Sequence, residues 1–223
     1  MDCDLAWPGD GKAAVTKGKK QAEFEYSEKG LALLVDLVNS LSIPATFFFE
    51  ARTALELDRK MPLKELMEGH EVACHGFEHE DFTKLSFHDK KDRLARSKWL
   101  LEKIFGRKIR GFRAPFLKAD AELMHALKEE NYSWDSSCTV ENSVLPQITA
   151  PKELYFWPLI EGTINEEEFW NRINAAKNPV LSTHSWHSVV DLNGKERKPE
   201  IERRLLNRMA QEKYEFATIA TVG

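Results

Sequence analysis

The stretch LALLVDLVNSLSIPATFFF, residues 31–49, joins a helical pattern directly to a strand pattern. Its leucines and valines recur every three or four residues, which predicts the apolar face of a helix running from about Ser27 to Ser42. The run from Ala45 to Phe49 follows at once and predicts a buried strand. A helix that passes directly into an apolar strand is typical of an α/β fold.

The same alternation continues outward along the chain. Pro62 opens a short helix that stops at Gly69, and a longer helix runs from the capping-box pair Ser86 and Asp89 to Gly106. The remaining helices are expected over 120–128, 166–176 and 200–212. The remaining strands are expected over 71–75, up to 112, over 132–135, 180–183 and 216–222. Alternation of this kind predicts a parallel sheet, either open or closed into a barrel, and one domain over residues 1–223.

The composition fits one globular domain and narrows the class of protein. The chain has 223 residues, of which 42% are hydrophobic, and 32 basic residues stand against 36 acidic ones. No broad positive field exists to hold nucleic acid, and no apolar run approaches the ~20 residues of a membrane span. An odd number of cysteines, three in all, favours a reducing compartment, so a cytoplasmic location is expected. Nothing at the amino end resembles a secretory signal.

Residues able to do chemistry recur at the carboxyl ends of the expected strands, where active sites of such folds lie. These residues are Asp2 and Asp4, His75 and His79, Arg113, Asp135 and His184. Each has an ordinary explanation when taken alone: solvated acids, hydrogen-bonded histidines, a surface ion pair or a turn residue. Their coincidence at successive strand ends favours a shared site. Two histidines and one carboxylate are a three-ligand set that leaves a coordination position for water.

The order of these segments resembles that of the polysaccharide deacetylase family, carbohydrate esterase family four. DCD at residues 2–4 resembles the first motif in a spaced form, HGFEH at 75–79 the second and RAPF at 113–116 the third. WDSS at 134–137 resembles a variant of the fourth motif, and LSTH at 181–184 the fifth. The resemblance implies a distorted (β/α) barrel of about seven parallel strands. It also implies removal of acetyl groups from N-acetylated saccharides.

Carried over to this chain, the resemblance implies a role for each residue. Asp4, His75 and His79 would hold a divalent metal, Asp2 would be the general base and His184 the general acid. Arg113 would orient Asp2, and Asp135 would tune His184. Zinc is the first choice of metal, with cobalt or nickel possible, because two imidazoles and a carboxylate suit all three. His187 receives no role.

Four aromatic residues beside the motifs offer flat faces for a sugar ring or are simply wall residues: Trp7, Phe77, Phe116 and Trp186. Substrate choice is expected to lie in the loops over 5–26 and 140–165. Only Met1 precedes Asp2, whereas strands usually have about five or six residues, so the first strand is expected to be truncated. Two other functions stay open. One is a metal-independent amidohydrolase acting on a small ureide or imide, and the other is a catalytically inactive carbohydrate-binding homologue.

Overall fold

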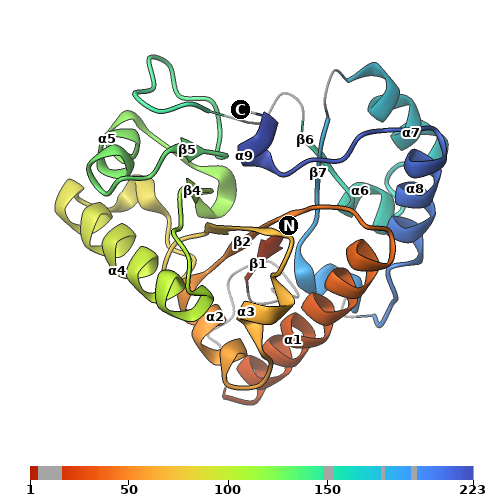
Figure 1. Cartoon of the computed structure of the whole chain (residues 1–223), viewed down its shortest axis with the longest axis horizontal. Helices are drawn as coiled ribbons and strands as arrows, with labels where there is room; N and C mark the ends of the chain where they lie inside the picture. The colour runs from red at the N-terminus through yellow and green to blue at the C-terminus, as the bar shows by residue number, and fades with distance from the viewer. Residues whose placement is uncertain (5–16, 148–152, 177–178, 192–194, 223) are drawn as a thin grey trace. The chain divides into compact units, whose positions relative to one another are not determined.

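The structure is a computed structural model that describes residues 1–4, 17–147, 153–176, 179–191 and 195–222. The chain divides into two compact units, which are described separately (Figure 1). The first unit is Met1–Ile43 with Lys152–Phe216, and the second is Pro44–Pro151 with Ala217–Gly223. The single domain expected over residues 1–223 stays a prediction.

The second unit contains four neighbouring parallel strands. They are β2 (Thr46–Phe49), β3 (Glu71–Cys74), β4 (Gly111–Phe112) and β5 (Trp134–Asp135), in this order. All of β2 is buried, and its three phenylalanines have no exposed surface. A strand buried on both faces belongs in a sheet covered by helices, which explains why its sequence is apolar without alternation.

The helices of the second unit confirm most of the expected boundaries. They are α2 (Ala51–Asp58), α3 (Leu63–Leu66), α4 (Phe87–Phe105), α5 (Ala121–Glu129) and α9 (Ile219–Val222). The Ser86 side chain accepts a hydrogen bond from the Asp89 amide at 3.2 Å, and Gly106 ends α4 in the left-handed region with φ 65°. Helices α4 and α5 lie side by side (Figure 1). The sequence analysis did not predict α2.

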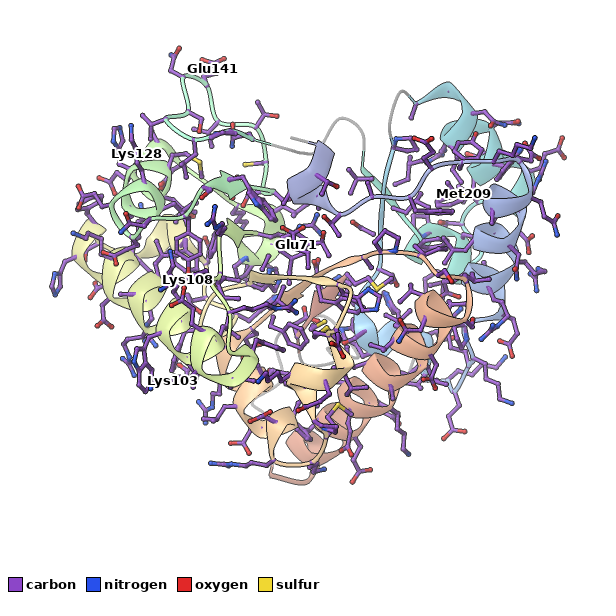
Figure 2. The ribbon with its side chains drawn as sticks, in the orientation of Figure 1. Glu71, Lys103, Lys108, Lys128, Glu141 and Met209 are labelled. Carbon is purple, nitrogen blue, oxygen red and sulfur yellow. The ribbon has the colours of Figure 1, made fainter. Side chains whose placement is uncertain are left out.

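The last residues of the chain depart from expectation, because the strand predicted over 216–222 is wrong. Residues 219–222 form α9 instead. The carboxylate of Glu71, labelled in Figure 2, accepts hydrogen bonds from the Thr46 hydroxyl at 2.6 Å and from the Ala220 amide at 3.1 Å. An acidic side chain that accepts from amides at the start of a helix favours the helix, and an apolar pattern of this length does not reveal such a partner.

The first unit combines both ends of its sequence around helix α1 (Lys17–Ser40). Strands β6 (Glu153–Tyr155) and β7 (Val180–Ser182) pair in parallel, and α6 (Trp157–Ile160), α7 (Glu166–Ala175) and α8 (Glu200–Gln211) complete the unit. Helices α7 and α8 are labelled in Figure 1. They are joined by an ion pair between Glu166 and Arg204. The sequence analysis did not predict β6.

The first strand of the chain is short, as expected. Strand β1 is only Asp2–Cys3, and Asp2 forms an isolated parallel bridge with His184. The expected α/β class is confirmed, whereas a closed barrel of about seven strands is not confirmed by the pairings of the described residues. Among those residues, no helix is long and apolar enough to cross a membrane.

Candidate active site

In the first unit, the two aspartates predicted at the amino end lie beside the predicted general acid. The Asp2 amide donates to the Thr183 carbonyl at 2.9 Å, which fixes the start of the chain next to the segment that follows β7. Both Asp2 and Asp4 are buried. The Ser27 hydroxyl from α1 donates to the main-chain carbonyl of Asp4 at 2.7 Å, so the helix also holds this residue in place.

The imidazole of His184 faces the carboxylate of Asp4. Its Nδ1 lies 3.2 Å from each of the two Asp4 oxygens. Burial lowers the pKa of His184, but the charge of Asp4 and its hydrogen bond outweigh burial, and the pKa is raised to about 9. His184 is therefore an imidazolium at neutral pH, the form that a general acid requires.

Two aromatic residues follow His184 in the 3₁₀ helix η4 (Ser185–Ser188). The Trp186 ring stacks on the His184 ring with 5.5 Å between centroids, and it is 4% exposed. It is thus a buried wall and offers no open face to a sugar ring. Neither ring nitrogen of His187 has a hydrogen-bond partner within the described parts of the chain. Burial, together with the charges of His184 and Arg197, lowers the pKa of His187 to about 3, so its ring stays neutral.

In the second unit, a tight turn after β3 brings the two predicted histidines together. His75 follows the strand directly, Gly76 takes φ 81° and His79 takes φ 59°. The two imidazole rings lie with centroids 5.3 Å apart and an interplanar angle of 64°. Left-handed backbone at Gly76 costs little because glycine lacks Cβ, so this residue allows the chain to return.

The tautomer of His75 follows from its hydrogen bond. Its Nδ1 lies 2.9 Å from the main-chain carbonyl of Arg113, which can only accept a hydrogen. Nδ1 therefore carries the proton, and Nε2 keeps its lone pair for a metal ion. The ring edge of His79 packs against Phe116 at 4.7 Å between centroids. Phe116 is 58% exposed, so its face is accessible beside these histidines.

The guanidinium of Arg113 is fully buried at the end of β4. Its Nε donates to the Ser136 carbonyl at 3.1 Å and its Nη2 to the Ser136 hydroxyl at 2.9 Å. It also lies over the Phe48 ring, 4.1 Å from the centroid. The expected position of Arg113 after a strand is confirmed, whereas its contact with Ser136 was not predicted.

Asp135 ends β5 in a network of its own. Its carboxylate accepts from the Ser137 hydroxyl at 2.6 Å, the Ser137 amide at 3.0 Å and the Gln147 side chain at 3.3 Å. The pKa of Asp135 is raised, because burial outweighs the lowering effect of these hydrogen bonds and of the charge of Arg113. The carboxylate that the structure places on His184 is Asp4, so the tuning role assigned to Asp135 stays a prediction. The two serines after Asp135 were the available signal for this network.

The predicted site residues therefore form two groups. The first unit brings together Asp2, Asp4 and His184, and the second holds His75 beside His79, with Arg113 and Asp135 at neighbouring strand ends. Trp7 lies outside the described residues, as do all of 5–16 and 148–152. The described remainder of the loop expected over 5–26 is helix α1, and that of the loop expected over 140–165 contains β6 and α6, so neither is wholly a loop.

The family resemblance is confirmed by comparison with known proteins. A family model described as "Polysaccharide deacetylase" matches residues 25–134. The matched segment contains His75, His79 and Arg113 and ends before Asp135. A curated relative, the peptidoglycan deacetylase-like protein FGM2 of Gibberella zeae, is 32% identical over 77 residues, or 34% of this chain. The match spans 23% of that protein.

Solved structures of polysaccharide deacetylases and related proteins share the fold over most of the chain. A protein from Mycobacterium smegmatis assigned to the polysaccharide deacetylases has a TM-score of 0.74 at 19% identity, covering 92% of this chain and 79% of its own. A carbohydrate esterase family four pseudoenzyme from Bacillus anthracis has a TM-score of 0.64 at 15% identity, covering 99% of this chain and 63% of its own. At these identities the likeness establishes the fold alone.

Proposed function

We propose that this chain is a metal-dependent hydrolase that removes N-acetyl groups from a saccharide containing amino sugars. The observation that carries the proposal is the His75–His79 turn. It joins two imidazoles at 5.3 Å between centroids and fixes the His75 proton on Nδ1 through the Arg113 carbonyl. An imidazole held in this way by a second partner is typical of metal-ligating histidines.

Asp4, His75 and His79 are the proposed ligands. Two imidazoles and a carboxylate fit a divalent cation of borderline softness, with zinc the first choice and cobalt or nickel the alternatives. A carboxylate has two oxygens with about four lone-pair sites, so Asp4 is able to serve both a cation and His184. A bound divalent cation supplies Lewis acidity, which lowers the pKa of water and polarises the acetyl carbonyl.

The chain's own residues carry the proton transfers. Asp2 takes the proton of the attacking water, and Arg113 orients Asp2 and favours its charged form. His184 delivers a proton to the departing nitrogen from Nε2, because Nδ1 faces Asp4. Its raised pKa, about 9, supports this role since the ring holds its proton at neutral pH. The products are acetate and a free amine on the saccharide. Asp135 helps to tune His184.

The test is acetate release from a panel of chitin-type and peptidoglycan-type N-acetylated saccharides, before and after chelation and after zinc is added back. We expect release to stop with the chelator and to return with zinc. Metal content of the purified protein should fall in His75→Ala and stay unchanged in His88→Ala, whose histidine is exposed on α4. Loss of His184 should reduce turnover about 10²- to 10⁴-fold.

Two results would replace this proposal. Turnover that is indifferent to chelation would favour a metal-independent amidohydrolase acting on a small ureide or imide. Saccharide binding without acetate release would favour a catalytically inactive carbohydrate-binding protein. A cytoplasmic location is also part of the proposal, since all three cysteines are free, with Cys3 and Cys74 buried.

A further inference from the structure

The charge of Arg113 is buried, which costs free energy unless the charge is paired and hydrogen-bonded. Its side chain is 0% exposed and is the largest of the fully buried side chains. A guanidinium has five N–H donors in a rigid planar fork, so its usefulness depends on which edge faces which partner. The residue that fixes this orientation therefore matters as much as the arginine.

Ser136 occupies one edge of the fork with two oxygens of a single residue. Its carbonyl accepts from Nε at 3.1 Å and its hydroxyl accepts from Nη2 at 2.9 Å. One flat face of the guanidinium is covered by Phe48, 4.1 Å from the ring centroid. Contacts on one edge and one face leave the plane of Arg113 little freedom to rotate. Ser136 therefore spans the Nε–Nη2 edge of the guanidinium and not its Nη1–Nη2 end.

Ser136 is itself held by the sheet. Its amide donates to the Phe112 carbonyl at 2.8 Å, and it is fully buried. The next residue, Ser137, accepts from the Ala114 amide at 2.8 Å and donates to Asp135 at 2.6 Å. The two serines thus join the end of β4 to the end of β5. Ser136 is placed by main-chain contacts that do not depend on Arg113, so it is able to orient the arginine.

We propose that Ser136 is a positioning residue, which holds the side edge of Arg113 so that the guanidinium keeps one orientation. This inference rests on the proposed function, in which Arg113 orients the general base. Without the Ser136 hydroxyl, the guanidinium turns about its stem and no longer orients the base. A misplaced base slows the chemical step without changing how tightly the saccharide binds.

The experiment compares Ser136→Ala and Ser136→Thr with a matched control, Ser97→Ala. Ser97 is also a fully buried serine of the second unit, and its hydroxyl donates to the Arg93 carbonyl of the same helix at 2.6 Å. We expect Ser136→Ala to lower kcat/KM near neutral pH by about tenfold, the factor for one hydrogen bond to a charged group. The fall should lie in kcat, with KM unchanged. Ser136→Thr, which keeps a hydroxyl, should restore kcat, and Ser97→Ala should change neither constant.

A second readout does not require turnover. The Nη2–H signals of Arg113 in an NMR spectrum of the full chain should exchange with water faster in Ser136→Ala than in the parent protein or in Ser97→Ala, because alanine lacks the hydroxyl that accepts from Nη2. An unchanged exchange rate overturns the positioning role even if the enzyme is active. Faster exchange with an unchanged kcat overturns the link between this orientation and catalysis. Absence of acetate release from the parent protein counts against the proposed function, and the exchange rate then still decides whether Ser136 holds Arg113.

Discussion

Replacement of Gly30 by alanine tests how closely helix α1 must approach the segment that carries His184. A Cβ at this position would lie 2.0 Å from the Ser185 carbonyl oxygen, 2.6 Å from its carbonyl carbon and 3.0 Å from the Trp186 Cα. All three atoms belong to the main chain, so no side chain can turn aside to make room. The Gly30→Ala protein must move α1 away from η4 or distort both.

The size of the effect follows from two opposing contributions. Alanine favours a helix over glycine by about 1 kcal/mol. Overpacking of a well-packed interior costs typically about 1–3 kcal/mol, and a contact with rigid main chain places this site at the upper end. We therefore expect Gly30→Ala to lower the free energy of unfolding by about 2 kcal/mol. The control is Lys29→Ala, because Lys29 is exposed on the same helix and its loss should change stability by less than about 0.5 kcal/mol.

Urea unfolding followed by circular dichroism measures both variants. Displacement of η4 should also weaken the contact between His184 and Asp4, so the pKa of His184, followed by NMR, should fall in Gly30→Ala and hold in Lys29→Ala. A Gly30→Ala protein as stable as the parent, or more stable, would refute this reasoning. It would mean that helix propensity outweighs the close approach.

Three other predictions concern separate contacts. In metal-free protein, NMR should find the His184 pKa near 9, and Asp4→Asn should lower it. Because the pKa of His184 is raised in the folded state, the stabilisation from its contact with Asp4 is fully present below the unfolded-state pKa of about 6.5. Thermal unfolding should show this stabilisation lost as pH rises through 9. Lys90→Met removes a buried ammonium bonded to two carboxylates at 2.8 and 2.9 Å, and urea titration should show a loss of about 1–2 kcal/mol, since those acids are partly solvated. Gly111→Ala would place Cβ 1.9 Å from the Trp134 ring, so we expect the free energy of unfolding in urea to fall by about 3 kcal/mol. An unchanged urea midpoint in either variant would contradict the prediction for that variant.

The sequence predicted correctly those helix ends that are determined by contacts between residues close together in the chain. The Ser86 cap and the left-handed Gly106 define the ends of α4 as predicted, because both act within one turn of the helix. The final segment was mistaken for a strand because its partner, Glu71, lies far away in the sequence. Periodicity carries no information on contacts of that kind.

The candidate site divides in the same way. The His75–His79 turn was predicted from its glycine, and the structure confirms it. The contact between Asp4 and His184 joins residues 180 positions apart, so the sequence indicated the two members without indicating the pair. Ser136 lies in the WDSS segment, and its contact with Arg113 could not be inferred from that segment alone.

The first unit is assembled from two distant stretches of the chain, and α1 contacts both Asp4 and the main chain at Ser185. During synthesis, this helix leaves the ribosome long before Ser185 has been made. The intervening stretch from Pro44 to Pro151 supplies nearly all of the second unit and is available to fold in the meantime. The face of α1 that packs on η4 therefore stays uncovered until the last third of the chain has been made, so the first unit forms after the second.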